Sequence, residues 1–456
     1  MKNYEMIPTE ENLIQALSED ILNRNKDIVY FYNLLMAQEG SSSIALDGRW
    51  GSGKTFFVRQ TMLVINAQNQ TCSMDANKRE KITYSLPLQS KEVDNTNCSL
   101  AVYYDAWKND NDIDPMLSIV YEITRQVSVD YNYSNKKLID MTVGLFEVLS
   151  GRSVSKLLEN LMGDNPYEKL KEQKEIDERI KHFFSEILLE RGNKLIVFID
   201  ELDRCKPTYA VRLLEQIKHY LTDDRITFVF SVNKGELQHT IKKHYGNDFD
   251  ACRYLDRFFD LSVMLPPADM AKYYATIGMN TGYISESVTK RIIEMYNLEL
   301  RSVSRFYRQV KTAVYVPVHA KDMRDFAFPE GKAKEFMLTF IVPLIIGLRI
   351  VNISIYDEFV NGKNVVPLLE LFKPKELGVW GLSGCLNRDE SFELEEGKRV
   401  VSTEEIIKRV YNAIFVKEYT NRYYSEQIGQ CEFDVRAKEF VISASNMMSN
   451  YADYNI

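Results

Sequence analysis

The sequence predicts an α/β protein in which a parallel sheet lies between two layers of helices and precedes a C-terminal helical domain. Over residues 1–267, short apolar segments alternate with segments of helical periodicity, which is typical of a parallel sheet with helical crossovers. Pro266 and Pro267 then mark a boundary, and helical periodicity dominates beyond them. A glycine-rich loop also joins the first apolar segment to a helical one.

The elements follow in order along the chain. Residues 10–38 have the pattern of an amphipathic helical lead-in, and residues near 68–99 are a polar surface excursion. Strands are predicted within "SSIALDG", "LAVYYD", "KLIVFID", "RITFVFSVN" and "DLSVMLPP", and helices at 55–67, 115–130 and 168–190, with a short helix carrying Arg253 and Arg257 before the last strand.

Length and composition indicate a globular chain of more than one domain. The 456 residues exceed the roughly 250–300 at which a single core stops growing. We predict domains at 1–267, with a helical insertion near 130–180, at 268–350, and at 351–456, the last mostly helical and without an assigned role. The net charge of −8 argues against a protein-wide basic surface for nucleic acid, although a local basic groove stays open.

The cysteines and histidines indicate the redox environment of the chain and the kinds of metal site it could hold. The six cysteines lie far apart with no Cys-x-x-Cys pair, and "MKNYEMIPTEENL" lacks a signal peptide, so a reducing, cytoplasmic setting is expected. His239 and His244 are five residues apart and would face different sides of a helix. A metal site built from histidine or thiolate is therefore not expected.

The longest apolar run is Phe336 to Leu348, interrupted by Pro343. A membrane-spanning helix needs about 20 apolar residues, so this run is too short, and we interpret it as a buried core helix. A membrane segment is the alternative.

"GRWGSGKT", residues 48–55, fits the G-x-x-x-x-G-K-[ST] spacing of a phosphate-binding loop. Its glycines permit backbone angles that wrap N–H groups round a phosphate, and the next helix adds its positive end. Lys54 is expected to reach the β- and γ-phosphates, Thr55 to bind Mg²⁺, and Trp50 to pack under or over the loop. A chance glycine-rich helix entry is the alternative. The predicted nucleotide-binding residues are Gly48, Trp50, Gly51, Ser52, Gly53, Lys54, Thr55 and Phe56.

Two adjacent carboxylates follow the strand "KLIVFID". A fully apolar run of this kind is typical of a central parallel strand whose carboxyl end faces the ligand crevice. Asp200 is predicted to hold Mg²⁺, and Glu201, pointing the other way, to polarise a water for attack on the γ-phosphate. A solvated acidic turn is the alternative interpretation.

The strand "RITFVFSVN" is expected beside the one that ends at Asp200. Its terminal Asn233 is a candidate for contact with the attacking water or the γ-phosphate. Asn233 could equally cap the helix that follows.

Four segments together resemble the KAP P-loop NTPases, a family named for a neuronal membrane scaffold and a plasmid-encoded phage-exclusion protein. They are "GRWGSGKTFF", "YYDAWKND", "VFIDELDRCKP" and "LRSVSRF". The resemblance covers about residues 20–350 and implies a P-loop NTPase three-layer sandwich that binds ATP and Mg²⁺. The residues that carry it are Trp50, Ala106, Trp107, Asp203, Arg204, Pro207, Arg301, Arg305 and Phe306.

Two departures from the family pattern stand out. Many members carry transmembrane helices between the two nucleotide motifs, whereas residues 130–180 here are too polar to span a bilayer, which favours a soluble branch. The form "LRSV" lacks the proline or asparagine that often precedes the arginine, which puts a sensor role of Arg301 in question.

The resemblance also implies an arginine at the γ-phosphate, in cis or from a neighbouring subunit, where it would stabilise charge on the transferring phosphoryl group. Arg257 and Arg301 are the candidates. Arg257 could instead pair with Asp256 or Asp260, and Arg301 and Arg305 could be a solvated face. With these, the predicted catalytic set is Lys54, Glu201, Asn233, Arg257 and Arg301.

The leading functional hypothesis is a Mg²⁺-dependent ATP hydrolase whose cycle switches the conformation of the helical domain and gates an effector or an assembly. One alternative is a nucleotide-bound scaffold that scarcely hydrolyses and recruits a protein partner. Another is a DNA-associated ATPase, which would use Lys290, Arg291, Arg301, Arg305, Arg308 and Lys311. A homo-oligomer is left open, and family analogy suggests a role in bacterial anti-phage defence.

Overall fold

A computed structural model describes the chain over residues 7–86, 99–112, 114–130, 178–179, 182–185, 188, 192–220, 223–280, 282–319, 328–373, 403–420 and 424–446. The chain forms two compact units, the first ending at Tyr273 and the second beginning at Tyr274. The predicted helical insertion near 130–180 lies almost wholly outside the described residues.

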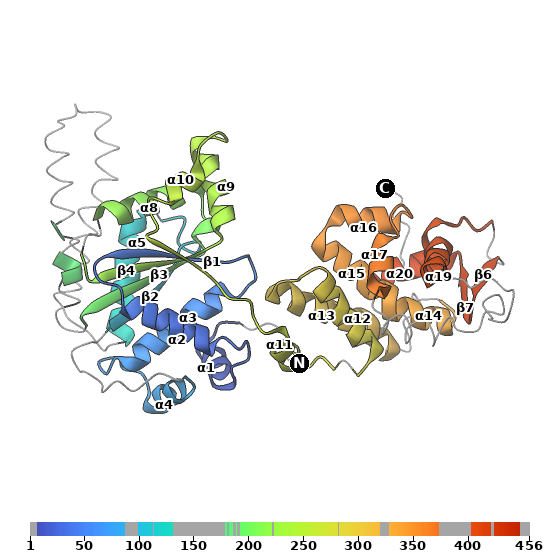
Figure 1. Ribbon diagram of the computed structural model, residues 1–456, viewed down its shortest axis with the longest axis horizontal. Coiled ribbons are helices and arrows are strands. Elements are labelled where there is room, and N and C mark those ends of the chain that lie inside the picture. Colours follow the sequence, from blue (N-terminus) through green and yellow to red (C-terminus); the bar gives the residue numbers. More distant parts are fainter. Residues whose placement is uncertain are drawn as a thin grey trace. The chain divides into compact units, whose positions relative to one another are not determined.

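The first unit is built on a sheet of five parallel strands in the order β2-β3-β4-β1-β5 (Figure 1). The central strands β3 and β4 are apolar and almost fully buried, as the continuous apolar runs in their sequences predict. The strands are β1 (Ser42–Asp47), β2 (Ser99–Asp105), β3 (Lys194–Asp200), β4 (Ile226–Val232) and β5 (Leu261–Met264).

Helices cover both faces of this sheet, so the predicted three-layer sandwich is confirmed (Figure 1). One layer packs around the helix that follows the glycine-rich loop and consists of α1 (Glu10–Glu19), α2 (Asn25–Met36), α3 (Lys54–Gln68) and α4 (Ala76–Tyr84). The other layer contains α5 (Pro115–Asp130), α8 (Pro207–Tyr220), α9 (Lys234–Tyr245) and α10 (Ala251–Leu255).

The N-terminal lead-in differs from the single helical segment expected for residues 10–38. It is two helices, α1 and α2, because the chain turns between them. Asp20 and Asn23 take left-handed backbone angles there, with φ of 45° and 54°. Both residue types tolerate this region, so they end α1 and redirect the chain. The polar excursion also contains a helix that the sequence pattern did not indicate, α4, capped by Asp75.

The second unit is mainly helical, as predicted, with one small antiparallel hairpin that was not. Its elements include α12 (Ile284–Met295), α13 (Leu300–His319), α14 (Lys332–Phe336), α15 (Val342–Val351), α16 (Ile353–Val360), α17 (Val366–Phe372), α19 (Thr403–Tyr411), β6 (Ser425–Ile428), β7 (Cys431–Asp434) and α20 (Arg436–Asn446). α11 (Met270–Thr276) spans the division between the units.

The long apolar run forms the core of this second unit. A π-helical turn, Met337–Ile341, leads into α15, and the side chains along both are largely buried. α15 packs against α12, α13 and α20, and a Cβ on its Gly347 would lie 2.7 Å from Ile292 Cγ2, so the helices approach closely there. No helix in the described ranges combines the length and apolar character needed to cross a bilayer.

Candidate active site

The candidate site lies at the carboxyl ends of the parallel strands. The register pairs Asp47 at the end of β1 with Val232 of β4, and Asp200 at the end of β3 with Ser231 of β4. The glycine-rich loop leaves β1, and its Gly48 N–H donates to the Val232 carbonyl at 3.2 Å. The loop and the acidic segment therefore start one strand apart, at the edge where open α/β sheets bind ligands.

The loop requires glycine at three positions, for two reasons. Gly51 and Gly53 have φ of 83° and 93°, a region that side chains disfavour. At Gly48 the limit is space, because a Cβ would lie 3.0 Å from Ser52 Oγ and 3.3 Å from Lys54 Cγ. The backbone thus folds back tightly on itself between β1 and α3.

The start of α3 presents unused hydrogen-bond donors. Gly53 is its N-cap and provides no side chain to cap the first N–H groups. Ser52 Oγ is buried without a hydrogen-bond partner, and the Thr55 hydroxyl makes no hydrogen bond within the described part of the chain. Phe56 is a core side chain, only 6 % exposed, so only its backbone N–H remains for a ligand. An anion is the natural partner of such a helix start.

Lys54 is folded back over this loop. Its Nζ donates to the carbonyl oxygens of Gly48 at 2.5 Å and Arg49 at 3.1 Å. Burial lowers the pKa of the Lys54 ammonium, while the carboxylates of Asp203, Asp200 and Asp47 oppose that shift. The ammonium therefore lies within electrostatic reach of the acidic segment.

Asp200 is held by two hydrogen bonds at the end of β3. Tyr103 of β2 donates its hydroxyl to Oδ2 at 3.0 Å, and the Glu201 N–H donates to Oδ1 at 3.0 Å. Burial and the nearby Asp200 charge raise the Tyr103 pKa, so this phenol stays protonated and donates. A buried carboxylate with lone pairs to spare and a hydroxyl at Thr55 form an oxygen donor set that fits Mg²⁺.

Glu201 follows in a left-handed conformation, with φ of 61°. Few residues other than glycine adopt this angle, and it directs the Glu201 side chain away from the course of β3. Its carboxylate pairs with Arg204, Oε2 to Nη1, at 3.0 Å, with only 16 % of the Glu201 side chain and 22 % of the Arg204 side chain exposed. The residue predicted to polarise water is thus engaged by a cation three residues on.

Trp50 joins the loop to the acidic segment. Its indole Nε1 donates to Asp203 Oδ2 at 2.5 Å. The Arg204 guanidinium lies 5.9 Å from the Trp50 ring and 5.2 Å from the Trp107 ring, within the range of cation–π attraction. Trp50 therefore lies over the loop and contacts the segment after β3.

A buried arginine also bonds the loop. Arg24, at the start of α2, donates to the Ser52 carbonyl at 3.0 Å and to the Pro266 carbonyl at 2.6 Å. The first acceptor is in the loop, and the second follows β5. The position of the loop is thus fixed to the last strand of the sheet.

At the end of β4, Asn233 caps α9. Its Oδ1 accepts from the N–H groups of Gly235 at 3.1 Å and Glu236 at 3.3 Å. This is the helix-cap arrangement, and a contact between Asn233 and phosphate or water stays a prediction. The neighbouring Ser231 has a buried hydroxyl without a partner, next to Asp200 in the register.

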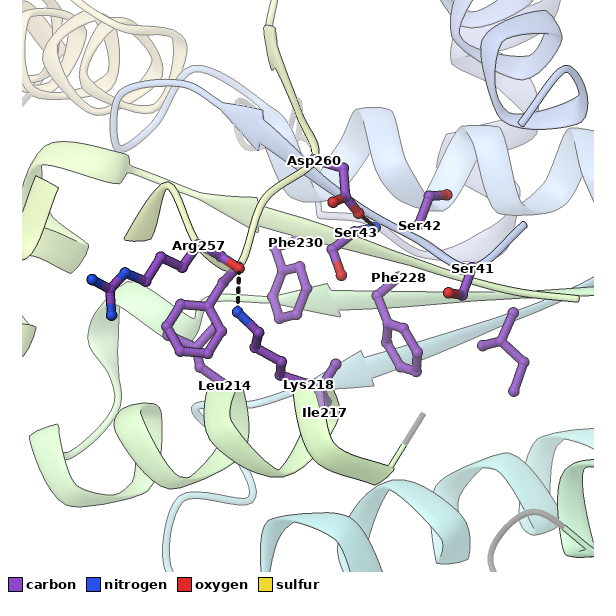
Figure 2. A pocket seen from close by; sticks show the side chains of 12 residues that line it. Ser41, Ser42, Ser43, Leu214, Ile217, Lys218, Phe228, Phe230, Arg257 and Asp260 are labelled. Carbon is purple, nitrogen blue, oxygen red and sulfur yellow. Dashed lines mark hydrogen bonds between the residues drawn. The ribbon is translucent and has the colours of Figure 1, made fainter. Parts of the chain in front are cut away.

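Arg257 lies in the segment that joins α10 to β5. It lines a cavity with Ser41, Ser42 and Ser43 (Figure 2), and the carboxylate of the neighbouring Asp256 lies 3.9 Å from Nζ of Lys234, the first residue of α9. Its side chain is exposed, and its carbonyl accepts from Lys218 Nζ at 2.9 Å. A contact of Arg257 with the γ-phosphate, in cis or from another copy, stays a prediction.

Arg301 and Arg305 belong to the second unit, on the exposed face of α13. The opposite face of α13 is buried through Val303, Phe306 and Val310. A role for either arginine at the nucleotide stays a prediction.

Comparison with protein families identifies the fold's relatives. Residues 24–315 match the KAP family P-loop domain, which is more than half of the chain. The chain belongs to the KAP family. The matched domain is a P-loop domain, which supports nucleotide binding by this chain. No match was found among curated proteins.

Solved structures give weak global similarity to this KAP protein. The ORC2 protein of Aeropyrum pernix in ADPNP and ADP complexes is 13% identical, with a TM-score of 0.34, over 86% of this chain and 92% of that one. The ORC1 protein of the same organism in complex with DNA is 14% identical, with a TM-score of 0.27, over 96% and 94%. PCH-2 of C. elegans is 10% identical, with a TM-score of 0.20, over 71% and 65%. Superpositions this poor carry no functional argument.

Several residues at this KAP site are not apparent from sequence motifs. Arg24 bonds a loop carbonyl 28 positions away and Pro266 242 positions away, so no local pattern marks it. Tyr103 reaches Asp200 only because β2 and β3 pair in register. Arg204 belongs to a recognised segment, but its pairing with Glu201 depends on the left-handed backbone of Glu201.

Proposed function

We propose that this KAP protein is a Mg²⁺-dependent ATP hydrolase that works as a nucleotide-driven conformational switch. The supporting observation is the direct bond between the two halves of the site, from Trp50 Nε1 to Asp203 Oδ2 at 2.5 Å. It places the phosphate loop against the segment that carries the paired acids. Lys54 experiences the charges of Asp200 and Asp203, as expected if all three surround one ligand.

Each residue has a distinct task in this proposal. The N–H groups of the loop and of the start of α3 bind the phosphates. Lys54 Nζ leaves the carbonyls of Gly48 and Arg49 and donates to β- and γ-phosphate oxygens instead. Glu201 accepts a proton from the water that attacks the γ-phosphate. Trp50 keeps the loop and the acidic segment together.

Asp200 and Thr55 would hold the metal. Bound there, Mg²⁺ supplies positive charge that neutralises the phosphate oxygens. Tyr103 and the Glu201 N–H orient the Asp200 carboxylate before any ion arrives. This support from neighbouring strands reduces the rearrangement needed on binding.

An arginine from a second copy would complete the site. Arg257 is exposed, which suits a contact in trans within a homo-oligomer. Arg301 of α13 is the other candidate, as a sensor of the bound nucleotide.

Phosphate release tests the proposal. The wild type is compared with Lys54→Ala and Glu201→Gln at saturating ATP and Mg²⁺. Lys54→Ala should lose nucleotide binding and turnover, whereas Glu201→Gln should bind ATP and turn over about 10²-fold more slowly. Equal rates in all three proteins would remove hydrolysis from the proposal. Tight ATP retention without turnover would favour a nucleotide-bound scaffold that recruits a protein partner.

One observation keeps the DNA-associated alternative in view. Arg301, Arg305 and Arg308 are exposed on α13, and none of the ion pairs between described residues includes them. Lys311 and Lys290 of the same basic set pair instead with Glu286 and Glu294. DNA binding that does not weaken as salt rises would rule out phosphate contacts by this face.

The cellular context follows from the family alone. A soluble, cytoplasmic bacterial member with an anti-phage role is the proposal, by analogy with phage-exclusion proteins. A nuclease or toxin encoded beside this protein would identify the effector that the switch controls. Neighbours unrelated to defence, found across many genomes, would count against it.

A further inference from the structure

Arg204 occupies an unusual position between the two halves of the site. It pairs with Glu201 at 3.0 Å, and the rings of Trp50 and Trp107 lie on its guanidinium at 5.9 and 5.2 Å. One ring comes from the phosphate loop and the other from the segment after β2. The guanidinium is therefore held by three segments that are distant in sequence.

Arg204 also lies within electrostatic range of the phosphate-binding lysine. Its charge contributes to lowering the pKa of the Lys54 ammonium, after the larger effect of burial. Two cations at one site are costly without anions between them. In the structure, the nearby anions are the carboxylates, Glu201 on Arg204 and Asp203 at Trp50.

We propose that Arg204 exchanges its partner, from the Glu201 carboxylate in the empty site to the terminal phosphate of a bound nucleoside triphosphate. Release of Glu201 then leaves its carboxylate available to water only when a γ-phosphate is present. The inference rests on the proposed nucleotide function and assigns to Arg204 the recognition of triphosphate over diphosphate. Arg204 is thus distinct from Arg257 and Arg301, because it acts from within the same site.

The charges favour this exchange. A terminal phosphate carries more negative charge than one carboxylate and offers several acceptor oxygens to the planar guanidinium. The two tryptophan rings restrict the guanidinium, so less conformational entropy is lost when it binds a phosphate. A diphosphate lacks the terminal group and leaves Arg204 with Glu201.

The decisive experiment measures binding rather than turnover. Isothermal titration calorimetry with Mg²⁺ gives the affinities for ADP and for a non-hydrolysable ATP analogue. The protein carries Glu201→Gln, with and without Arg204→Gln. In this background, Arg204→Gln should lower the affinity for the ATP analogue roughly tenfold, because one charge-assisted contact is lost. The affinity for ADP should fall less than twofold.

The neutral Glu201→Gln background separates two explanations. If Arg204 only masks the Glu201 charge, its removal has no consequence once that charge is gone. An Arg204→Gln substitution that leaves the analogue affinity unchanged in this background would overturn the exchange. Arg125→Gln is the matched control, because Arg125 pairs with Glu122 at the same spacing of three residues on α5.

Retained ADP binding shows that the loop is intact in each variant. If Arg204→Gln loses ADP binding as well, Arg204→Lys is measured in its place. Arg204→Lys should lower the affinity for the analogue by a smaller factor, since a lysine keeps the charge but not the planar guanidinium. Equal losses for both nucleotides, or none, would contradict the proposal. A wild type that binds neither nucleotide would refute the proposed function itself, and the exchange with it.

Discussion

Two lysines at opposite ends of the sheet are both bonded to backbone carbonyls but differ in their electrostatic surroundings. Lys54 donates to the carbonyls of Gly48 and Arg49, and Lys194, at the start of β3, donates to those of Leu35 and Gln38, both at 2.8 Å. Burial lowers the pKa of both ammonium groups. Only Lys54 also responds to three carboxylates, Asp203, Asp200 and Asp47.

The surroundings of the two lysines differ in the same way. At the amino end, a charged group bonds the backbone: the Asp260 carboxylate accepts from the Ser43 N–H at 2.8 Å (Figure 2). A cavity of about 150 Å³ extends from there along α8 and β4. At the carboxyl end, the hydroxyls of Ser52 and Ser231 are buried without partners.

The largest expected effect comes from replacing these two lysines in turn. Lys54→Met should lower ATP turnover by roughly 10²-fold or more, because the charge that faces the phosphates is removed. Lys194→Met removes a similar buried ammonium and should leave turnover within twofold. Phosphate-release rates decide, after circular dichroism has shown that both variants fold. Similar losses in both would mean that the comparison reflects stability alone.

Two glycines give the next contrast. Gly53→Ala places a side chain at φ of 93° and should cost about 1–2 kcal/mol of folding free energy, together with loss of nucleotide binding. Gly235→Ala, in the first turn of α9, puts a Cβ 3.4 Å from Asn233 Oδ1, an ordinary contact, and should change stability little. Urea unfolding with and without ADP measures both quantities. Nucleotide binding by Gly53→Ala at wild-type affinity would contradict the assigned loop geometry.

A smaller effect is expected from the Tyr103 hydroxyl, which orients the carboxylate proposed to bind the metal. Tyr103→Phe removes the bond to Asp200 Oδ2 and should raise the Mg²⁺ concentration needed for half-maximal turnover by roughly tenfold at most. Tyr209→Phe is the control, since that phenol bonds Tyr104 on the other face of the sheet. A changed maximal rate with an unchanged Mg²⁺ requirement would argue against Asp200 as a metal ligand.

The smallest expected effect is a pH dependence at the amino end. The Arg225 hydrogen bond holds the pKa of Asp223 below its ordinary 3.8. The folded state therefore prefers the ionised form, and this stabilisation is present above about pH 4 and lost as pH falls through the folded-state pKa. Asp223→Asn should cost up to about 1 kcal/mol at pH 7 and nothing at low pH, measured by urea unfolding. An equal cost at both pH values would assign the effect to packing.

Much of the first unit could be predicted because its signals are local. The five strands, their parallel direction and the placing of β4 beside β3 follow from apolar runs separated by helical segments, and the structure confirms them. The loop from Gly48 to Thr55 and the adjacent acids Asp200 and Glu201 are marked by spacing within a few residues. Features defined by spacing within a few residues can be predicted from the sequence alone.

The remaining features depend on distant contacts. The sequence pattern does not indicate which strand lies at which edge, and the order β2-β3-β4-β1-β5 emerges only from pairing. Arg24, Tyr103 and the contact of Trp50 with Asp203 join residues between 28 and 242 positions apart.

Arg24 has a mechanical consequence for the chain. Its guanidinium donates one hydrogen bond from Nη1 to the Ser52 carbonyl and another from Nη2 to the Pro266 carbonyl. Pro266 stands where the polypeptide leaves the sheet on its way to the helical unit. Arg24 therefore joins the glycine bend to this exit, and by thermodynamic reciprocity any coupling between a ligand in the bend and the position of the exit acts in both directions.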